Sequence, residues 1–592
     1  MGPVPEQPCN LFAAFTLLAA LRRLGLARLV LCPGSRSTPL ALAAAALEPS
    51  GLALHTAIDE RSAAFFALAL GRAEGVPAAV VTTSGTAVAN LLPAAVEADQ
   101  GTVPLLLLTA DRPARLKGCG ANQSVNQEQF LRCCCRWFGQ GPPQGLAVAS
   151  RAELAAMAER AFAAATGQVA PTPPGPVQLN LPFEDPLHPS AAQLRALGDL
   201  LPAAPPAAGP SSPPTVPLPD RERPLLRPDE PGIVVAGPWR GLPSAWEGHL
   251  EAVRRWQRRT GWPVLADALS GLRGQPDLEV VAGYDLLLEA PGAELDPPQV
   301  LRLGPLPASR RLERWLERQA GPQVLVSEGD PRPLDPLRRV RGQWPAGLAA
   351  WLRNLPGPAA GADEVAPTCR EFAGRWHRLE GRLQHWLDRQ LPTRRWSEPL
   401  LARLLARQLP PRLPVMLANS SPVRDWESFA SGAVLRPLHG FRGASGIDGT
   451  LSLACGLAEA LGHVVLVSGD LALLHDGNGW LWSRQLRGRL TVVLIDNGGG
   501  GIFEQLPVRQ LAPADLDFER LFAMPQPVDA CALAAVHGIP ARTVPEPSGL
   551  APGLEWALAQ PFALLRIPTD RQDDAVLRRR LRTMAQQAIS EP

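Results

Sequence analysis

The sequence predicts an α/β protein with three domains, each a parallel sheet flanked by helices. Its 592 residues are too many for one ordinary hydrophobic core, which favours several domains. Short apolar runs are continuous rather than alternating, and Ala/Leu-rich helical stretches separate them. This pattern is typical of parallel strands that are buried on both faces. Two stretches rich in Pro, Gly and Ala, residues 197–231 and 355–367, divide the chain into three parts.

The first part, residues 1–196, consists of strand–turn–helix units. "ARLVLCPGS" and "AAVVTTSGTA" each predict a strand that runs into a Gly/Ser turn, and "VPLLLLTADRP" and "GPVQLNLP" predict two further strands. The apolar stretch before the first strand predicts a helix. Arg22 and Arg23 interrupt it after about ten residues, so it is too short to span a bilayer. Its charge order, with Glu6 ahead and the arginines behind, is also wrong for a signal peptide.

The other two parts repeat this alternation. Residues 232–367 predict a central α/β domain with strands at "GIVVAG", "WPVLAD" and "YDLLLEA". Residues 368–592 resume strands and helices in a way that makes the first and third parts look like one architecture used twice. The predicted organisation is therefore 1–196, a Pro-rich linker at 197–231, 232–367 and 368–592.

Composition excludes several classes of protein. The chain is 46% hydrophobic and 19% charged with a net charge of +2, which predicts a soluble globular protein and gives no reason to expect a nucleic-acid partner. Lys117 is the only lysine, and the many arginines, together with abundant Ala, Pro and Gly, are explained by the codon usage of a GC-rich genome. The nine cysteines make no disulfide framework, and their odd number fits a reducing compartment. We expect a cytoplasmic protein with no membrane span.

In the third part, polar residues follow two apolar runs. "VVLVSG" leads into Asp470, and "LTVVLID" leads into Asn497 and four glycines. Ligands of open parallel sheets bind beyond the carboxyl ends of strands, where oxygen ligands suit Mg²⁺ and glycines let the backbone approach a diphosphate. Taken singly, Asp470 would more often be only a helix N-cap, but the pair favours a metal–diphosphate site. His475 and Asp476 are interpreted as residues at the start of the next helix with no catalytic part.

This pattern of Gly469-Asp470 and Asn497 resembles the cofactor signature of thiamine diphosphate enzymes. The resemblance implies Mg²⁺ (or Mn²⁺) held by Asp470, Asn497 and the backbone carbonyl of Gly499. It also implies a first-domain carboxylate that hydrogen-bonds the aminopyrimidine ring. Glu60 is the candidate, although alone it would be read as a first-turn acid that complements a helix dipole. In this family the first, pyrimidine-binding domain of one subunit meets the third, diphosphate-binding domain of another, which implies a homo-oligomer with active sites at a subunit interface.

Longer motifs narrow the resemblance. "CPGSRSTPL", "DERSAAFFALALG", "LLLLTADRP", "GANQSVNQ", "ANSSPVRDW", "RGASGIDGTLS" and "GGIFEQLP" are similar to the 2-succinyl-5-enolpyruvyl-6-hydroxy-3-cyclohexene-1-carboxylate synthases of menaquinone and phylloquinone biosynthesis. The similarity covers both outer domains and is loose in the central one. It implies decarboxylation of 2-oxoglutarate and conjugate addition of the resulting succinyl carbanion to isochorismate.

The same resemblance implies roles for individual residues, several of them arginines that can bind the substrates' carboxylates bidentately. The isochorismate side comprises Ser35, Arg36, Arg112, Asn122, Gln123, Arg310 and Arg311. The oxoglutarate-derived chain is held by Ser420, Arg424 and Arg442. Cofactor contacts comprise Ser420, Gly469, the apolar wedge Ile447, and Ile502 and Phe503, which form an apolar wall with Leu506. The expected catalytic residues are Glu60, Gln123 and Arg442.

One departure and two rival readings remain. The family often has side chains where this chain has Gly498 and Gly501, which predicts a more mobile loop and weaker cofactor retention. An acetolactate-synthase-like or 2-oxoacid decarboxylase activity is the rival enzyme, but pyruvate, with one carboxylate, would not need so many arginines. A non-catalytic thiamine-binding protein would require loss of Glu60, Asp470 or Asn497, and all three are present.

Overall fold

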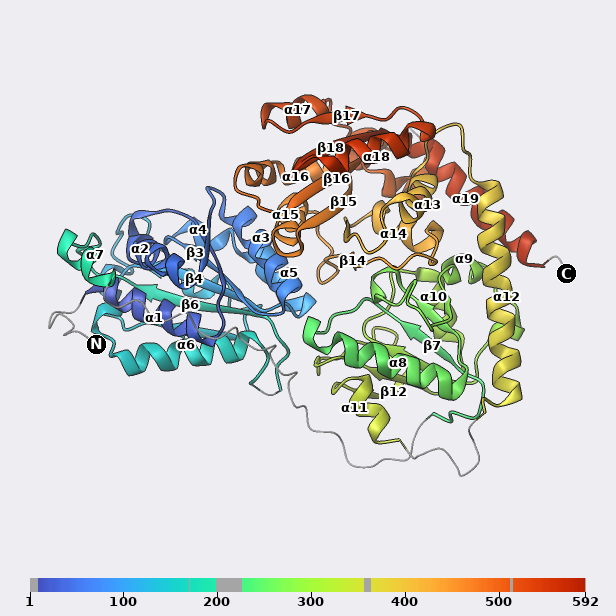
Figure 1. Cartoon of the computed structure of the whole chain (residues 1–592), viewed down its shortest axis with the longest axis horizontal. Coiled ribbons are helices and arrows are strands. Elements are labelled where there is room, and N and C mark those ends of the chain that lie inside the picture. Colours follow the sequence, from blue (N-terminus) through green and yellow to red (C-terminus); the bar gives the residue numbers. More distant parts are fainter. Residues whose placement is uncertain (1–8, 170, 199–225, 356–363, 512–514, 591–592) are drawn as a thin grey trace.

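The computed structural model describes residues 9–169, 171–198, 226–355, 364–511 and 515–590, and it confirms the predicted α/β class. Figure 1 shows three sheets, one in the blue N-terminal third, one in the green middle third and one in the orange-to-red C-terminal third. Each sheet has six strands, and all neighbouring strands are parallel. Most of the predicted linker and of the second Pro/Gly/Ala stretch lies outside the described residues.

The first and third sheets have the same topology. Their strand orders are β2-β1-β3-β4-β6-β5 and β14-β13-β15-β16-β18-β17, which are identical when strands are counted within each domain. The prediction of one architecture used twice is therefore confirmed. The strands are β1 (Arg28–Leu31), β2 (Ala53–Thr56), β3 (Ala78–Thr82), β4 (Leu105–Asp111), β5 (Trp137–Gln140), β6 (Pro176–Pro182), β13 (Val415–Leu417), β14 (Leu438–His439), β15 (His463–Gly469), β16 (Arg489–Asp496), β17 (Ala541–Thr543) and β18 (Phe562–Pro568).

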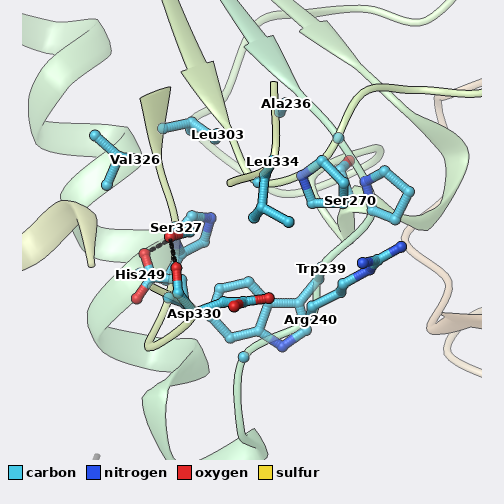
Figure 2. A pocket seen from close by; sticks show the side chains of 16 residues that line it. Ala236, Trp239, Arg240, His249, Ser270, Leu303, Val326, Ser327, Asp330 and Leu334 are labelled. Atoms are coloured by element: carbon cyan, nitrogen blue, oxygen red, sulfur yellow. Dashed lines mark hydrogen bonds and ion pairs between the residues drawn. The ribbon is translucent and has the colours of Figure 1, made fainter. Parts of the chain in front are cut away.

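The middle sheet has a different order, β12-β11-β10-β7-β8-β9, so its two halves diverge from β7 and β10. In such sheets the crevice for ligands lies where the order reverses. A pocket opens there, and Figure 2 shows Trp239, Arg240, His249 and Asp330 among the side chains around it. The strands are β7 (Ile233–Ala236), β8 (Val264–Ala266), β9 (Val280–Val281), β10 (Val300–Leu303), β11 (Gln323–Val326) and β12 (Val340–Trp344).

One predicted strand is wrong. The run "YDLLLEA" begins with a short helix, α9 (Tyr284–Leu287), all of whose residues are buried. A continuous apolar run of this length fits a buried strand or a buried helical turn equally well, so periodicity does not distinguish them. At the N-terminus, by contrast, the predicted helix and strand are confirmed as α1 (Asn10–Leu24) and β1.

The first and third domains of one chain share a hydrophobic core. Helix α3 (Glu60–Glu74) packs along α15 (Thr450–Leu461), and buried residues of both belong to one cluster. The Ser62 and Ser452 hydroxyls lie 2.7 Å apart, and the Phe66 ring stacks on Trp482 with centroids 3.9 Å apart. A Cβ at Gly456 would lie 2.4 Å from the Phe66 carbonyl oxygen, so glycine permits this close approach.

The middle and third domains are also joined. The long helix α12 (Pro367–Gln390) packs against both α9 and α19 (Arg571–Ser590), and it runs beside both domains in Figure 1. Its buried tryptophans, Trp376 and Trp386, belong to a core that includes residues of both sheets. Within the described residues, no helix is long and apolar enough to cross a membrane.

Candidate active site

A pocket of about 170 Å³ lies at the carboxyl ends of β13, β15 and β16 in the third domain. The structure confirms that β15 and β16 are adjacent parallel strands, so the residues that follow them share one edge of the sheet. Eight residues predicted from the sequence line this pocket: Ser420, Ile447, Gly469, Asp470, Asn497, Gly499, Ile502 and Phe503. Leu506, four residues after Ile502, is not among the lining residues.

Asp470 joins the two strand ends. It is the first residue of α16 (Asp470–His475), and its Oδ1 accepts a hydrogen bond from the Leu471 amide at 2.7 Å. Its Oδ2 accepts one from the Gly499 amide, also at 2.7 Å. Burial raises the pKa of Asp470 to about 6, and the two backbone hydrogen bonds only partly oppose this. A bound cation would favour the ionised carboxylate.

Asn497 lies directly after β16, and its side chain is held from one end only. Its Nδ2 donates to Oε1 of Glu398 at 2.8 Å. Its Oδ1 is buried and has no hydrogen-bond partner among the described residues. A buried acceptor without a partner costs on the order of 1–3 kcal/mol. This unpaired amide oxygen follows the strand next to the one that leads into Asp470, and it fits a hard cation that prefers oxygen ligands.

Glu398 belongs to a buried cluster of charged side chains. Glu398 begins α13 (Glu398–Gln408), and its Oε2 accepts from Nη2 of Arg578 at 2.8 Å. Arg578 comes from the C-terminal helix α19, is 1% exposed, and also pairs with Asp425. The Glu398 amide donates to Asp574 at 3.2 Å. The orientation of Asn497 therefore depends on residues of three helices, α13, α14 (Ser421–Phe429) and α19.

Three of the four glycines after Asn497, Gly499, Gly500 and Gly501, are packed closely. Gly499 has φ +118°, and a Cβ there would lie 2.1 Å from the Ala523 carbonyl oxygen. A Cβ at Gly500 would lie 2.5 Å from the Phe522 carbonyl oxygen, and one at Gly501 would lie 2.7 Å from Nδ2 of Asn497. Backbone thus excludes side chains at Gly499 and Gly500, whereas a side chain at Gly501 would displace the amide of Asn497. Gly498 differs, because at φ +77° its Cβ would meet only Nη1 of Arg571, at 3.4 Å.

Three arginines gather beside the pocket. Nη1 of Arg442 donates to Oδ1 of Asn419 at 2.9 Å, and Nη1 of Arg424 donates to the Ser420 carbonyl at 2.8 Å. Burial lowers the pKa of Arg424, and the charges of Arg442 and Arg310 lower it further. Such crowding of like charges is unfavourable unless an anion joins them. The three guanidinium groups therefore form a site suited to carboxylates.

Arg311 does not share this environment. Its guanidinium pairs with Glu289 at 2.6 Å and with Asp285 at 3.5 Å. Arg310 is the first residue of α10 (Arg310–Arg318) and is exposed. Its charge contributes to the lowered pKa of Arg424. Of the two adjacent arginines, Arg310 is thus the one whose charge acts on Arg424 and that makes no ion pair within 4.0 Å among the described residues.

The first-domain candidates form a second cluster at the carboxyl edge of their own sheet. Nη1 of Arg112 donates to the Gln123 carbonyl at 2.8 Å and to the Ser84 hydroxyl, and Nε2 of Gln123 donates to the Ser84 carbonyl at 2.8 Å. Arg36 donates to the Phe183 carbonyl at 2.8 Å. Burial lowers the pKa of Arg112, and the charge of Arg36 adds to the effect. Two further candidates are exposed residues in the same loops, Ser35 and Asn122.

Glu60 lies apart from the third-domain pocket of its own chain. It opens α3, where the Asp59 carboxylate caps the helix by accepting from the amides of Arg61 and Ser62. Glu60 is half-buried and is not among the residues lining the pocket. Ile58, two residues earlier, is 78% exposed, which is unusual for a large apolar side chain. One chain therefore does not bring Glu60 and Asp470 into a single cavity.

His475 and Asp476 lie outside the pocket lining. Asp476 is fully buried, precedes the short 3₁₀ helix η9 (Gly477–Arg484), and accepts from the Ser452 amide at 2.7 Å. The carbonyl of His475 accepts from Arg61 at 2.9 Å. Both residues thus connect third-domain segments to α15 and α3. Between β15 and β16 the chain forms α16 and then η9.

Comparison with known proteins agrees with this geometry. Family models match at residues 13–130 (thiamine pyrophosphate enzyme, N-terminal TPP binding domain), 226–415 (middle domain of thiamine pyrophosphate) and 434–567 (thiamine pyrophosphate enzyme, C-terminal TPP binding domain). A 2-succinyl-5-enolpyruvyl-6-hydroxy-3-cyclohexene-1-carboxylate synthase of Synechococcus sp. (strain RCC307) is 55% identical over 97% of both chains. This chain belongs to that synthase family. The synthase of Synechococcus sp. (strain CC9311) is 52% identical over 97% of this chain and 100% of the relative, and that of Prochlorococcus marinus (strain MIT 9313) is 51% identical over 96% and 99%.

Membership of this synthase family identifies thiamine diphosphate as the cofactor, with the divalent metal typical of such enzymes. The third-domain pocket fits that group, because Asn497 has a buried oxygen with no partner in the described part of the chain and Gly499 leaves no side chain in the way. The Gly499 carbonyl accepts from the Gly501 amide at 2.8 Å and keeps a second lone pair. The predicted boundary at 367/368 stays a prediction, since the middle-domain match extends to residue 415.

Sequence reasoning missed residues that support this site of the synthase family. Glu398 lines the pocket and holds Asn497, but it precedes Asn497 by 99 residues and sits in an ordinary helix start, "SEPLL". Asn419 lies within the motif "ANSSPVRDW" and was not singled out. Its Nδ2 donates to the carbonyls of Phe441 and Gly446 at 3.0 and 2.7 Å. The one signal in the sequence is an Asn close to the end of a strand, two residues after β13 here and directly after β16 at Asn497.

Proposed function

We propose that this chain decarboxylates 2-oxoglutarate and adds the resulting succinyl group to isochorismate, giving 2-succinyl-5-enolpyruvyl-6-hydroxy-3-cyclohexene-1-carboxylate for menaquinone or phylloquinone biosynthesis. The observation that carries the proposal is the gathering of Arg310, Arg424 and Arg442 beside the pocket of Asp470 and Asn497. Three adjacent guanidinium groups suit substrates that together bring several carboxylates. A substrate with a single carboxylate would leave much of this charge unneutralised.

The third-domain residues would hold the cofactor. Asp470, the Oδ1 of Asn497 and the Gly499 carbonyl would bind Mg²⁺ or Mn²⁺, and the metal would bind the diphosphate. Thiamine diphosphate supplies the electron sink for loss of CO₂. Ile447, Ile502 and Phe503 would hold its rings and exclude water. Ser420 and Gly469 would also contact the cofactor, and their small size would let it approach the backbone.

The arginines would place the two substrates. Arg442 and Arg424, each fixed by a contact to Asn419 or Ser420, would bind the chain derived from 2-oxoglutarate. Arg36, Arg112 and Gln123, with Ser35 and Asn122, would bind isochorismate from the first domain. Arg310 would reach isochorismate from the middle domain. Arg311 supports this role less, because Glu289 and Asp285 already neutralise it.

We also infer that the active unit is at least a homodimer with its sites between subunits. Glu60 is needed against the cofactor's aminopyrimidine ring, yet it does not line the pocket of its own chain. A second copy that supplies Glu60 would also cover the exposed Ile58. A cytoplasmic location is supported by the nine cysteines, all of which are free.

The decisive assay supplies the purified protein with Mg²⁺, thiamine diphosphate, 2-oxoglutarate and isochorismate, and follows the loss of isochorismate absorbance. We expect consumption that requires both substrates. A parallel assay offers pyruvate in place of 2-oxoglutarate. Faster decarboxylation of pyruvate would contradict the proposal and favour an acetolactate-synthase-like activity.

A further inference from the structure

We propose that Glu97, a first-domain carboxylate, is a positioning residue that sets the active-site loop carrying Arg442. The inference rests on the proposed function, because it concerns the arginine that would bind the chain derived from 2-oxoglutarate. We call residues 440–447, which lie between β14 and α15 and include Ile447, the substrate loop. Glu97 lies in α5 (Leu92–Gly101) and is 5% exposed.

The Glu97 carboxylate binds three successive backbone amides of the substrate loop. Oε1 accepts from the Gly443 amide at 2.7 Å. Oε2 accepts from the Ala444 amide at 2.7 Å and from the Ser445 amide at 3.2 Å. Consecutive amides that converge on one anion form a nest, in which charge strengthens each hydrogen bond. The loop has no regular secondary structure at these residues, so the carboxylate takes the place of a strand or helix partner.

The rest of the substrate loop is fixed from two other directions. Arg240, on the rim of the middle-domain pocket in Figure 2, donates from Nη2 to the Arg442 carbonyl at 3.0 Å and from Nη1 to the Gln100 carbonyl at 2.9 Å. Asn419 binds the carbonyls at both ends of the loop and, through Oδ1, the guanidinium of Arg442. The backbone around Arg442 is therefore held by all three domains.

The approach of the loop to α5 is close. A Cβ at Gly443 would lie 2.7 Å from the Gly101 amide nitrogen and 2.8 Å from Oε1 of Glu97. The loop therefore has no freedom to move toward the first domain. It can move away only if the three hydrogen bonds to Glu97 break, and such a shift would carry Arg442 with it. A displacement of about 1 Å at a binding group can cost on the order of 10²-fold in rate.

A carboxylate can accept all three of these hydrogen bonds, whereas a side-chain amide cannot. Three N–H donors need acceptors, and both carboxylate oxygens of Glu97 accept. A glutamine of the same shape presents one acceptor and one NH₂ group, which would face an N–H donor. Glu97→Gln should therefore release part of the substrate loop without removing volume from the interface.

The test compares holoenzymes of wild type, Glu97→Gln and a control, Glu74→Gln. Glu74 is a first-domain carboxylate that pairs with Arg28, away from the loop. We expect Glu97→Gln to raise the KM for 2-oxoglutarate at least tenfold. It should also weaken calorimetric binding of glutarate, which has both carboxylates but no keto group, by a similar factor. The affinity for thiamine diphosphate with Mg²⁺ should stay within about twofold, and Glu74→Gln should match wild type in all three.

A second variant keeps the test decisive if Glu97→Gln does not fold. Gly443→Ala leaves the carboxylate intact but pushes the loop off it, so it should give the same loss of glutarate binding. Wild-type affinity for glutarate and wild-type KM in either folded variant would overturn the inference. If wild type itself fails to consume 2-oxoglutarate with isochorismate, the proposed function fails instead, and the two failures are distinguishable.

Discussion

The side chain of Asn497 connects the structure of the third domain to the chemistry proposed there. One end of its amide donates to Glu398, and the oxygen at the other end is buried with no hydrogen-bond partner among the described residues. Glu398 in turn is held by Arg578 in a buried cluster. Residues that orient a metal ligand typically contribute 10–100-fold to metal affinity or activity. Glu398 should therefore matter although it would not touch the metal.

We predict that Glu398→Gln weakens Mg²⁺ binding in the presence of thiamine diphosphate by about tenfold or more. The amide cannot accept from both Asn497 and Arg578, so one of two buried donors loses its acceptor. Titration of Mg²⁺ by quenching of tryptophan fluorescence measures this. Glu555→Gln, at an exposed position of α18 (Leu550–Ala559), is the matched control. Equal Mg²⁺ affinity in Glu398→Gln and wild type would contradict the prediction.

Among the structural elements, the loop after β16 stands out by its run of four glycines. The glycine run predicted a more mobile loop, yet the Cβ positions at residues 499–501 are closed by neighbouring carbonyls and by Asn497. Close packing thus explains why glycine occupies residues 499–501. Only Gly498 has room for a side chain. The greater mobility of the loop stays a prediction.

The two ends of the glycine run should respond differently to substitution. Gly501→Ala places a methyl group 2.7 Å from Nδ2 of Asn497, so we expect thiamine diphosphate to bind about tenfold more weakly. Gly498→Asn should be tolerated, because Asn adopts positive φ readily, and should bind the cofactor at least as tightly as wild type. Fluorescence titration of the cofactor measures all three proteins. Identical affinities would remove the role assigned to this loop.

The interface of η9 with α15 and α3 contains a buried carboxyl whose titration is measurable. Burial raises the pKa of Asp476 to about 6, above the value near 3.9 of an unfolded Asp. The folded state therefore holds this proton more tightly. The free energy of unfolding contains a penalty that grows as the pH rises from about 4 to about 6 and is constant above that.

We predict that Asp476→Asn, which keeps an acceptor for the Ser452 amide, removes this penalty. Relative to wild type, the variant should gain up to about 3 kcal/mol in its free energy of unfolding between pH 4 and pH 7. Urea unfolding at several pH values measures the difference. A difference that does not change with pH would show that Asp476 does not titrate as described.

Across the whole molecule, the sequence predicted most of the strands and sheets, but not the residues that hold the active-site side chains in place. Continuous apolar runs before Asp470, Asn497 and Asp111 predicted strands because parallel strands buried on both faces need them. The strand predicted at 284–290 was wrong because so short a buried segment shows no hydrophobic periodicity that separates a strand from a helix. Glu97 and Glu398 carried no signal, since they act on residues 346 and 99 positions away.

We propose that the active site is divided between the two outer domains. Within one chain, α3 packs on α15, which leaves Glu60 outside the pocket of Asp470 and Asn497. The first-domain cluster of Arg36, Arg112 and Gln123 is a separate group of contacts at its own sheet edge. We therefore infer that a complete site needs two copies of the chain, related by symmetry.

Co-expression of Glu60→Gln chains with Asp470→Asn chains tests whether the active site is shared between subunits. Each variant alone should be almost inactive in consuming isochorismate with 2-oxoglutarate. In mixed dimers, one of the two sites would combine an intact Glu60 with an intact Asp470, so random assembly should restore about a quarter of wild-type activity. No recovery beyond the sum of the two single variants, with mixed dimers present by mass, would contradict a site shared between subunits.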